Sequence, residues 1–351
     1  MKILHFIEAH TVHTERIARR QRAAGHEVLV ATSSDRVGGP GVHVLPRGPR
    51  ASRLPYAHHW QGIGAFRRLV RLWRPDLVHG HYLSTAGLYL AVCHSRPVVA
   101  SAMGSDVLID TRAAHARALI RASPRWVDRY TSVAPHLTRR MVDLGIPKES
   151  ISTFPWGIDL SVFHPPSDPP DRSIVVSTRG FEPVYDVTTV VSAFTNLAVH
   201  HDGSRLVLYG DGSLRSALLD QIRREGIGRR VDLMGRADSE TLSRGLGSAS
   251  VYVSTSLSDG TSTSLLEAMA TGLVPVVTDV EANREWVSDG ENGLRFPPRD
   301  VPALERALER ALTDDALRAR ARAMNPKLVA ERGSLDTSIH RLDEVYRTAV
   351  A

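Results

Sequence analysis

The chain of 351 residues contains one cysteine, Cys93, and three lysines, Lys2, Lys148 and Lys327. A single thiol excludes a disulfide framework and a zinc site built on several cysteines, so we expect Cys93 to fill the core. No run of 18 apolar residues occurs, and the N-terminal segment MKILHFIEAH lacks a cleavage site after an apolar run. These absences predict a cytoplasmic chain without a transmembrane segment.

The net charge differs in sign between the two halves of the chain, and the first half is the basic one. Residues 1–165 carry 22 Lys and Arg against 11 Asp and Glu, whereas residues 166–351 carry 22 against 27. This asymmetry predicts two domains with different partners, and the basic one could meet anionic lipid, a phosphorylated acceptor or nucleic acid. No helix-turn-helix, zinc-finger or RNA-recognition signature is present, so no nucleic-acid partner is expected.

Short apolar runs alternate with helical patterns along the whole chain. Strands are expected at residues 2–7, 27–33, 42–45, 77–81, 97–102 and 129–134, and again at 173–179, 205–210, 231–235, 250–255 and 274–279. Such alternation predicts parallel sheets with helices on both faces. The predicted fold class is therefore α/β, with two Rossmann-like domains facing one another across a cleft and ligands at the carboxyl ends of the strands.

A proline-rich segment, residues 155–171, separates the two halves. Its five prolines are too many for a helix or a central strand, so we interpret it as the linker between domains. The predicted domains are residues 1–160 and 161–333. Residues 334–351 are expected to form one helix that packs back on the first domain.

The most informative segment is SDGTSTSLLEAMATGLVPVVT, residues 258–278. A strand is expected to end in a loop with Asp259 and Gly260, and a helix to begin near Thr263. The free backbone N–H groups and the positive dipole end of a helix start make an anion site. The Glu267 carboxylate, about one turn further on, could accept two ribose hydroxyls. From these residues alone, a nucleotide diphosphate site and an ordinary capped helix remain equally good interpretations.

The same segment resembles the signature of retaining glycosyltransferase family 4, which has the GT-B fold. The match comprises Leu266-Glu267-Ala268-Met269-Ala270, Gly272, Pro275 and Val276. Similarity continues along nearly the whole chain, at Gly25-His26-Glu27-Val28, Val78-His79-Gly80-His81, Gly104-Ser105-Asp106, Val133-Ala134-Pro135, residues 154–159 with Phe163, and Gly290-Glu291-Asn292-Gly293. This many matches in the same order is more specific than any single motif.

The resemblance implies a donor site in the second domain. Its predicted catalytic residues are Arg179, which would neutralise the leaving pyrophosphate, and Asp259, which would contact the transferred sugar where the family usually has Glu. Glu267 would bind the ribose. The other predicted donor-binding residues are Gly210, Asp211, Gly212, Met234, Gly235, Arg236, Gly260, Thr261, Ser262, Thr263, Ser264 and Leu265.

The chain departs from the family pattern at two places. The family commonly has a lysine five residues after the phosphate-binding arginine, where RGFEPVYDV (179–187) offers Val184 or Tyr185. A histidine that often precedes the Gly-x-Asp motif is Met103 here, and His81 could take its role. These departures leave open a subunit that binds the donor without transferring the sugar.

Candidate acceptor-binding residues lie in the first domain and are His10, His13, Arg16, His81, Met103 and Asp106. The residues of the first loop could equally be ordinary polar surface residues. His79 and His81 share one face of a strand, a spacing that can hold a metal. However, no Asp-x-Asp pair occurs, and the resemblance implies metal-independent transfer, so no metal and no cofactor is expected.

The predicted function is a retaining, hexosyltransferase-like enzyme that moves a sugar from a nucleotide diphosphate sugar to an acceptor hydroxyl. A UDP-sugar is favoured as co-substrate, and the acceptor would be a natural product or a cell-envelope glycan or lipid. A non-catalytic nucleotide-sugar-binding subunit and a sugar-nucleotide epimerase are the alternatives. Peripheral membrane contact remains an option, although the arginines of residues 111–129 are more simply read as a solvated helix face.

Overall fold

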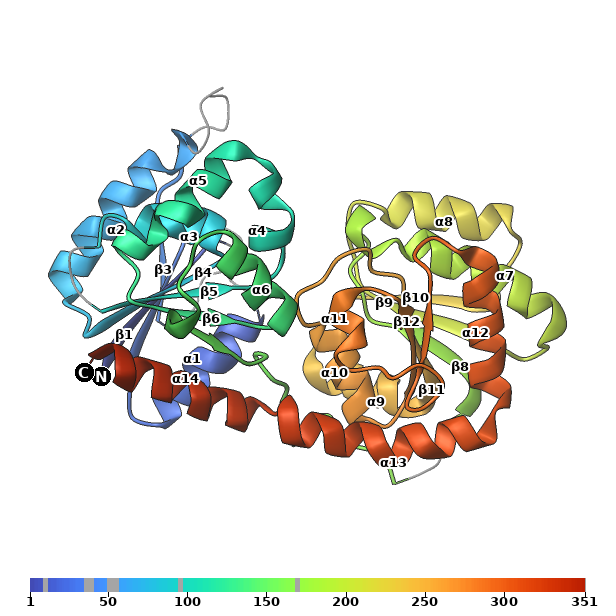
Figure 1. Ribbon diagram of the computed structural model, residues 1–351. Helices are drawn as coiled ribbons and strands as arrows, with labels where there is room; N and C mark the ends of the chain where they lie inside the picture. The colour runs from blue at the N-terminus through green and yellow to red at the C-terminus, as the bar shows by residue number, and fades with distance from the viewer. Residues whose placement is uncertain (9–11, 35–40, 49–56, 94–96, 168–170, 351) are drawn as a thin grey trace. The chain divides into compact units, whose positions relative to one another are not determined.

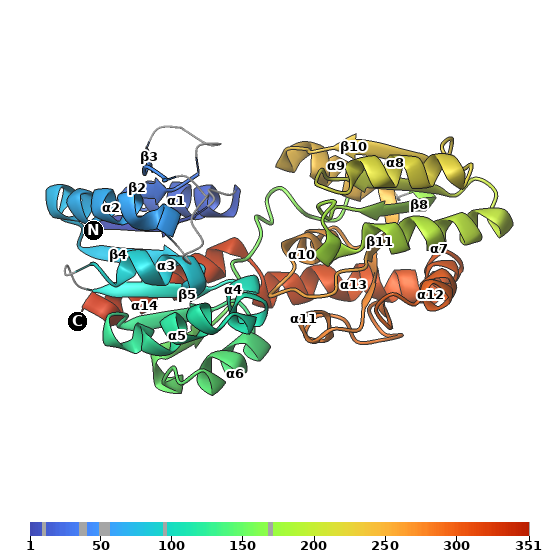
Figure 2. The ribbon, with the colours of Figure 1, turned by 90° about the horizontal axis from the view of Figure 1, so that it is seen from above.

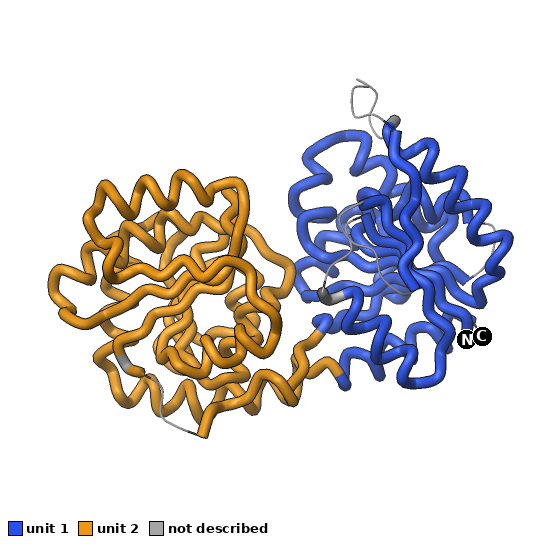
Figure 3. Tube along the Cα trace, turned by 180° about the vertical axis from the view of Figure 1, so that it is seen from behind, with its two compact units in different colours: residues 1–156, 336–351 blue, residues 157–335 orange. Residues whose placement is uncertain are grey.

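The structure, a computed structural model, describes residues 1–8, 12–34, 41–48, 57–93, 97–167 and 171–350 (Figure 1). The chain divides into two compact units, Met1–Trp156 with Asp336–Ala351, and Gly157–Leu335 (Figure 3). The sequence placed these divisions at 160/161 and 333/334. No helix among the described residues is both long and apolar enough to cross a bilayer.

The first unit is built on a seven-stranded sheet in which every strand pair is parallel, with the order β3-β2-β1-β4-β5-β6-β7. Its strands are β1 (Lys2–Ile7), β2 (Glu27–Thr32), β3 (Val42–Val44), β4 (Leu77–His81), β5 (Val98–Ala102), β6 (Arg129–Ser132) and β7 (Ile151–Thr153). The edge strand β7 was not predicted, because Ile151 is its single apolar residue and no apolar run marks it.

Helices cover both faces of this sheet (Figures 1 and 2). One face carries α1 (Val12–Ala23) and α14 (Leu335–Val350), and the other carries α2 (Trp60–Trp73), α3 (Leu83–Leu90) and α5 (Ala114–Ala122). The short α4 (Ser105–Leu108) follows β5, and α6 (Pro135–Asp143) follows β6. Parallel strands require such crossover helices, because each chain must return to the same end of the sheet.

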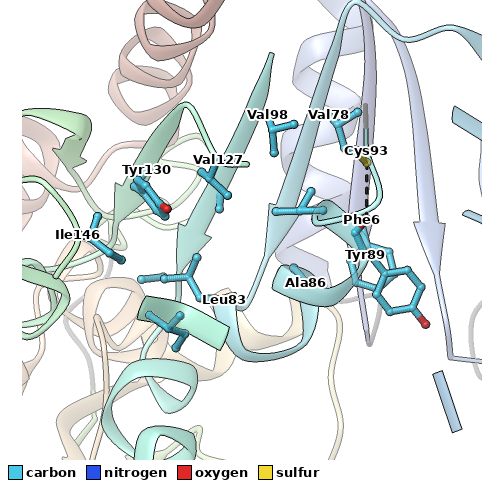
Figure 4. Close-up of a cluster of buried hydrophobic side chains, with 14 of the residues drawn as sticks. Phe6, Val78, Leu83, Ala86, Tyr89, Cys93, Val98, Val127, Tyr130 and Ile146 are labelled. Carbon is cyan, nitrogen blue, oxygen red and sulfur yellow. Dashed lines mark hydrogen bonds between the residues drawn. The ribbon is translucent and has the colours of Figure 1, made fainter. Parts of the chain in front are cut away.

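The core of the first unit contains the single cysteine (Figure 4). The rings of Phe6 and Tyr89 stack with centroids 3.9 Å apart, and the Cys93 thiol donates to the Tyr89 carbonyl at 3.6 Å. Burial raises the pKa of Cys93 to about 12. The prediction that Cys93 fills the core is confirmed, since its side chain is buried and unreactive in character.

The second unit has a six-stranded sheet, also parallel throughout, with the order β10-β9-β8-β11-β12-β13. Its strands are β8 (Asp171–Ser177), β9 (Arg205–Tyr209), β10 (Val231–Gly235), β11 (Ala249–Ser254), β12 (Val274–Thr278) and the unpredicted edge strand β13 (Leu294–Phe296). The α/β fold class, with two Rossmann-like parallel sheets, is confirmed. Their arrangement across a cleft stays a prediction.

Two hydrophobic clusters enclose the second sheet. One packs α7 (Val187–His200), α8 (Arg215–Arg224) and α12 (Val301–Thr313) against it, and the other packs α9 (Ser239–Ser248), α10 (Thr263–Ala270) and α13 (Asp315–Arg332). The short α11 (Glu281–Arg284) follows β12. Aspartates cap α12 and α13, since Asp300 accepts from the Ala303 N–H and Asp314 from the Leu317 N–H, both at 2.9 Å.

The two ends of the second unit lie side by side. Ile158 forms a parallel bridge with Ser334, through N–H groups of Ile158 and Leu335 that donate at 2.9 and 2.8 Å. Gly157 has a φ of 70°, and a Cβ there would lie 2.4 Å from the Ser334 carbonyl oxygen. Glycine is therefore required where these two segments meet.

Three buried histidines connect α1 and α14 to the middle of the first sheet. Nδ1 of His5 lies 2.9 Å from Nε2 of His81, and its Nε2 lies 2.8 Å from Oε1 of Gln21. Nδ1 of His79 lies 2.7 Å from the Tyr346 hydroxyl, which also accepts from Gln21 at 3.3 Å. Burial lowers the pKa of His5 to about 4 and lowers those of His79 and His81. The network is thus built from neutral imidazoles.

This network predicts that mild acid destabilises the first unit. An unfolded histidine binds a proton near pH 6.5, whereas folded His5 stays neutral down to about pH 4. The unfolded state binds more protons in this window, so the free energy of unfolding falls as the pH is lowered from 7 to 5. His5 alone contributes about 2 kcal/mol to this fall. Asp106 offsets part of it, because burial raises its pKa to about 6 and protonation relieves that cost.

Urea unfolding at pH 7 and pH 5, followed by tryptophan fluorescence, measures this effect. Four of the five tryptophans, Trp60, Trp73, Trp126 and Trp156, belong to the first unit, so the signal reports mainly on it. The non-titrating variant His5→Gln should lose less stability between the two pH values than the wild type. An equal loss in both proteins would contradict the assignment to His5.

Candidate functional site

A buried arginine lies just beyond the carboxyl end of β8. Nη1 of Arg179 donates to the hydroxyls of Ser262 at 2.8 Å and Ser264 at 2.9 Å, and its Nη2 donates to Oδ2 of Asp259 at 2.6 Å. Burial alone would lower the pKa of Arg179, but the Asp259 carboxylate together with Tyr252 and Tyr185 outweighs this and raises it. The two predicted catalytic residues therefore form an ion pair.

An aromatic ring lies against the same guanidinium. The ring centroid of Tyr185 is 4.1 Å from Cζ of Arg179, within the range of a cation–π contact. The backbone at this tyrosine is held in place by the Thr255 hydroxyl, which donates hydrogen bonds to the carbonyls of Tyr185 and Asp186 at 2.8 and 2.9 Å. Tyr185, one of the two residues that could stand at the position of the family's lysine, thus lies against the arginine and adds no second charge.

Three consecutive residues at this strand end have buried polar atoms without a partner: Oγ of Ser177, Oγ1 of Thr178 and Nε of Arg179. Buried polar groups are nearly always hydrogen-bonded, so an unsatisfied row of this kind calls for an explanation. All three atoms can donate a hydrogen bond. Acceptor oxygens of a ligand at this strand end would be suitable partners for such donors.

The start of α10 lies beside this row. Ser262 caps the helix, with its hydroxyl accepting from the Leu265 N–H at 3.3 Å, and the Gly260 N–H donates to Oδ1 of Asp259 at 3.1 Å. The first amides of a helix have no partner within it and favour an anion. Glu267 is buried on α10. The predicted donor-binding residues of this segment, Gly260, Thr261, Ser262, Thr263, Ser264, Leu265 and Glu267, all lie on this loop and helix.

The ends of β9 and β10 complete the same edge of the sheet. Gly210 has a φ of 148°, and a Cβ there would lie 2.4 Å from the Arg179 carbonyl oxygen. A Cβ on Gly212 would lie 2.5 Å from the Phe181 carbonyl oxygen. These glycines are thus required for the packing of two strand-end loops, whether or not they also contact a ligand. Asp211 accepts the Phe181 N–H at 3.1 Å through its carbonyl.

Met234, Gly235 and Arg236 are the predicted donor-binding residues at the end of β10. The Met234 side chain is 53% exposed. The carbonyl of Gly235 accepts the Gly210 N–H at 2.8 Å, which joins this segment to the β9 loop. Arg236 follows and is exposed. The structure therefore brings the predicted donor-binding residues together at one edge of the second sheet, and their contacts with a ligand stay predictions.

Among the predicted acceptor-binding residues, Asp106 has a structural task. Its carboxylate accepts the backbone N–H groups of Leu83 at 2.7 Å, Gly104 at 2.9 Å and Met103 at 3.1 Å. These bonds tie the loop after β4 to the loop after β5. Met103 is half-buried and packs against the core of the first unit.

His81 ends β4 and is fully buried, and its Nδ1 has no partner. The Trp156 ring meets it edge-on at 4.9 Å between centroids. Arg16 is nearly buried on α1. His10 lies outside the described residues, and of His13 only its position on α1 is described.

Sequence reasoning missed a polar cluster at the carboxyl end of β1. The Glu8 carboxylate accepts the Thr85 hydroxyl at 2.9 Å and pairs with Arg47. One ligand atom from each of Glu8, His58 and His59 lies within 4.8 Å of the others, as is also true of His5, His79 and His81. Arg47 already neutralises Glu8, and hydrogen bonds account for every ring nitrogen of the buried trio except Nδ1 of His81. The available signal for Glu8 was its position directly after the first strand.

Each of the two units is an α/β unit with a parallel sheet, and the second has a buried arginine and a helix start at one sheet edge. These features are those of a protein of the GT-B class. Known proteins give its family. The model of Glycosyl transferases group 1 matches residues 163–327, and that of Glycosyltransferase Family 4 matches residues 10–162. Together the two models match residues 10–327, and the chain belongs to the glycosyltransferases of family 4 and group 1 that they describe.

Individual relatives have low sequence identity to this chain, but their similarity covers nearly its full length. The glycogen synthase of Mycobacterium tuberculosis is 24% identical over 362 residues, which covers 91% of this chain and 86% of that protein. Sucrose-phosphate synthase from Thermosynechococcus elongatus superimposes with a TM-score of 0.83 at 19% identity, covering 99% and 98%. Anabaena HepE in complex with UDP-glucose gives 0.81 at 16% identity, covering 99% and 100%. These two structures show a shared fold.

Proposed function

We propose that the chain is a retaining glycosyltransferase that moves a sugar from a nucleotide diphosphate sugar to a hydroxyl of an acceptor. The observation that carries this proposal is the unsatisfied row at Ser177, Thr178 and Arg179. Diphosphate oxygens accept hydrogen bonds from both hydroxyls and guanidinium groups. The neighbouring start of α10 supplies further N–H donors and a favourable dipole.

A uridine nucleotide is the favoured donor. The fold shared with HepE, whose structure holds UDP-glucose, supports this choice. Glu267 would accept the ribose hydroxyls, and the segment from Met234 to Arg236 would contact the base. The acceptor would be a natural product or a cell-envelope glycan or lipid, bound by the basic first unit.

The ion pair suggests how transfer is prepared. In the free protein Asp259 neutralises Arg179 at 2.6 Å. A bound diphosphate would take over that neutralisation, which releases the Asp259 carboxylate toward the sugar. Arg179 then stabilises the charge that develops as the bond from the sugar C1 to the phosphate oxygen breaks.

The acceptor oxygen would bond to the same face of C1, and its proton would pass to the departing phosphate oxygen. Such front-side displacement retains the anomeric configuration and needs no separate protein base. Arg179 and the α10 N-terminus supply the positive charge, so transfer is proposed to be independent of metal.

A thermal-shift screen tests the donor. UDP, GDP, TDP, ADP and CDP are compared, with and without EDTA. UDP at about a hundred times its dissociation constant should add roughly 2.7 kcal/mol of stability, a shift of several degrees that EDTA leaves unchanged. If no nucleoside diphosphate shifts the transition, both the transferase and the donor-binding subunit are excluded.

Removing the carboxylate of Asp259 should separate catalysis from binding. Asp259→Ala and Asp259→Asn free Arg179 from its counterion, so UDP should bind at least as tightly as in the wild type. Transfer should fall by about 10²–10³-fold, as when one charge-stabilising group is lost. Unchanged turnover would remove Asp259 from the mechanism. A wild type that binds UDP-sugar but never transfers or hydrolyses it would favour the non-catalytic subunit.

The ring of Tyr185 should matter for diphosphate affinity through Arg179. Tyr185→Leu removes the cation–π contact, which is worth about 0.5–2 kcal/mol, and should weaken UDP binding about 2- to 30-fold. Tyr185→Phe is the matched control and should bind UDP like the wild type. Calorimetry measures both. Equal affinity of the Leu and Phe variants would show that the ring does not support the site.

A further inference from the structure

A groove with a volume of about 460 Å³ lies at the edge of the first sheet, between α14 and the strands β6 and β7. This size falls in the range of small-molecule sites. We call it the α14–β7 groove, and its polar lining residues include Arg129, Glu149, Ser152, Arg341, Glu344 and Thr348. All of them belong to the first unit, whereas the predicted donor-binding residues belong to the second.

Helical spacing places one wall of the groove on α14. Arg341, Glu344 and Thr348 are three and four residues apart, so their side chains lie along one side of the helix. Val345 belongs to the same side and is buried, as is Phe154 directly after β7. These two side chains give the groove an apolar base below its charged rim.

The opposite wall comes from the edge of the sheet. Strand β7 pairs with β6, and Ser152 lies opposite Thr131 in this register. Arg129 precedes Thr131 by two residues on β6, so the side chains of Arg129 and Ser152 point to the same face of the sheet, the one that carries α14. Glu149 lies in the turn Lys148–Ser150 that leads into β7. The groove is thus formed by segments from distant parts of the sequence.

Two arginines and one glutamate of this groove lack an ionic partner among the described residues. Arg341 and Glu149 are exposed, and in the described part of the chain neither forms an ion pair or a side-chain hydrogen bond. Arg129 donates to a backbone carbonyl at 3.2 Å. Glu344 lies 3.3 Å from Nε2 of the exposed His340. The groove therefore offers both hydrogen-bond donors and hydrogen-bond acceptors to a ligand.

This mixture of signs selects against charged ligands. A phosphate that contacted the arginines would also face Glu149 and Glu344, and an amine that contacted the carboxylates would face Arg129 and Arg341. A hydroxyl donates to a carboxylate and accepts from a guanidinium, so neighbouring hydroxyls of one ring satisfy both kinds of group. The apolar base suits the C–H faces of such a ring.

We propose that the α14–β7 groove binds a neutral carbohydrate, with none of the residues proposed for the sugar transfer. The hydroxyls of one or two sugar rings would contact Glu149, Arg341 and Arg129, and a ring would lie above Val345 and Phe154. A glycan held there would stay on the protein between transfers, which raises its effective concentration. That consequence rests on the proposed function, whereas the binding itself does not.

Calorimetry of the full chain with maltotriose, cellotriose and mannotriose tests the proposal, and inorganic phosphate is the charged comparison. The wild type should bind at least one trisaccharide, and added salt should leave this binding unchanged, because the ligand is neutral. Glu149→Ala/Arg341→Ala should weaken it about tenfold or more, since a hydrogen bond to a charged group contributes about that much. Both side chains are exposed, so the fold should be retained.

A second variant, Thr348→Trp, fills the groove with a bulky side chain and should abolish binding without removing a charge. The matched control, Arg306→Ala/Glu331→Ala, removes an exposed arginine and an exposed glutamate of the second unit and should bind the sugar like the wild type. Circular dichroism of every variant verifies the fold, and the UDP thermal shift should be unchanged in the groove variants.

The proposal is overturned if none of the trisaccharides binds, if the groove variants bind the sugar as well as the control does, or if phosphate binds the groove and the sugars do not. Failure of UDP to bind the wild type would contradict the proposed function and leave the result for the groove standing.

Discussion

Parallel strand pairing is the constraint on which the rest of this protein depends. Every strand of both sheets points the same way as its neighbours, so the carboxyl ends of each sheet lie along one edge. Loops that are far apart in sequence are thereby brought together, as when Arg179 after β8 meets Asp259 after β11. The polar cluster of Glu8, Arg47 and Thr85 arises in the same way at the edge of the first sheet.

Burial of the Arg179 guanidinium then organises the second edge. A buried cation must be neutralised and hydrogen-bonded, and here Asp259, Ser262 and Ser264 provide both. Its remaining Nε, together with two hydroxyls, is left unsatisfied. The polar groups of this edge are therefore held in place by the protein itself, and three of their donors have no protein partner.

Much of this could be predicted from sequence. The alternation of strands and helices gave the fold class, and the run from Asp259 to Glu267 indicated the loop and helix of the candidate site. Edge strands β7 and β13 were missed because their sequences, IST and LRF, contain no run of apolar residues, whereas the equally short β3 lies in the apolar segment VHVL. His5 was missed because its role depends on pairing in register with His79 across two strands that are distant in sequence. Tyr185 was noticed only as a missing lysine.

The sequence by itself determined which residues carry charge, which segments are apolar, and where glycine permits a turn, because these are properties of single residues and short periods. Only the tertiary structure decided that Gly210 and Gly212 allow one loop to pack on another. It also decided that the Asp106 carboxylate accepts hydrogen bonds from backbone amides and that the Trp60 side chain is exposed. Each of these depends on which distant segment lies opposite, and that is settled by sheet order and burial.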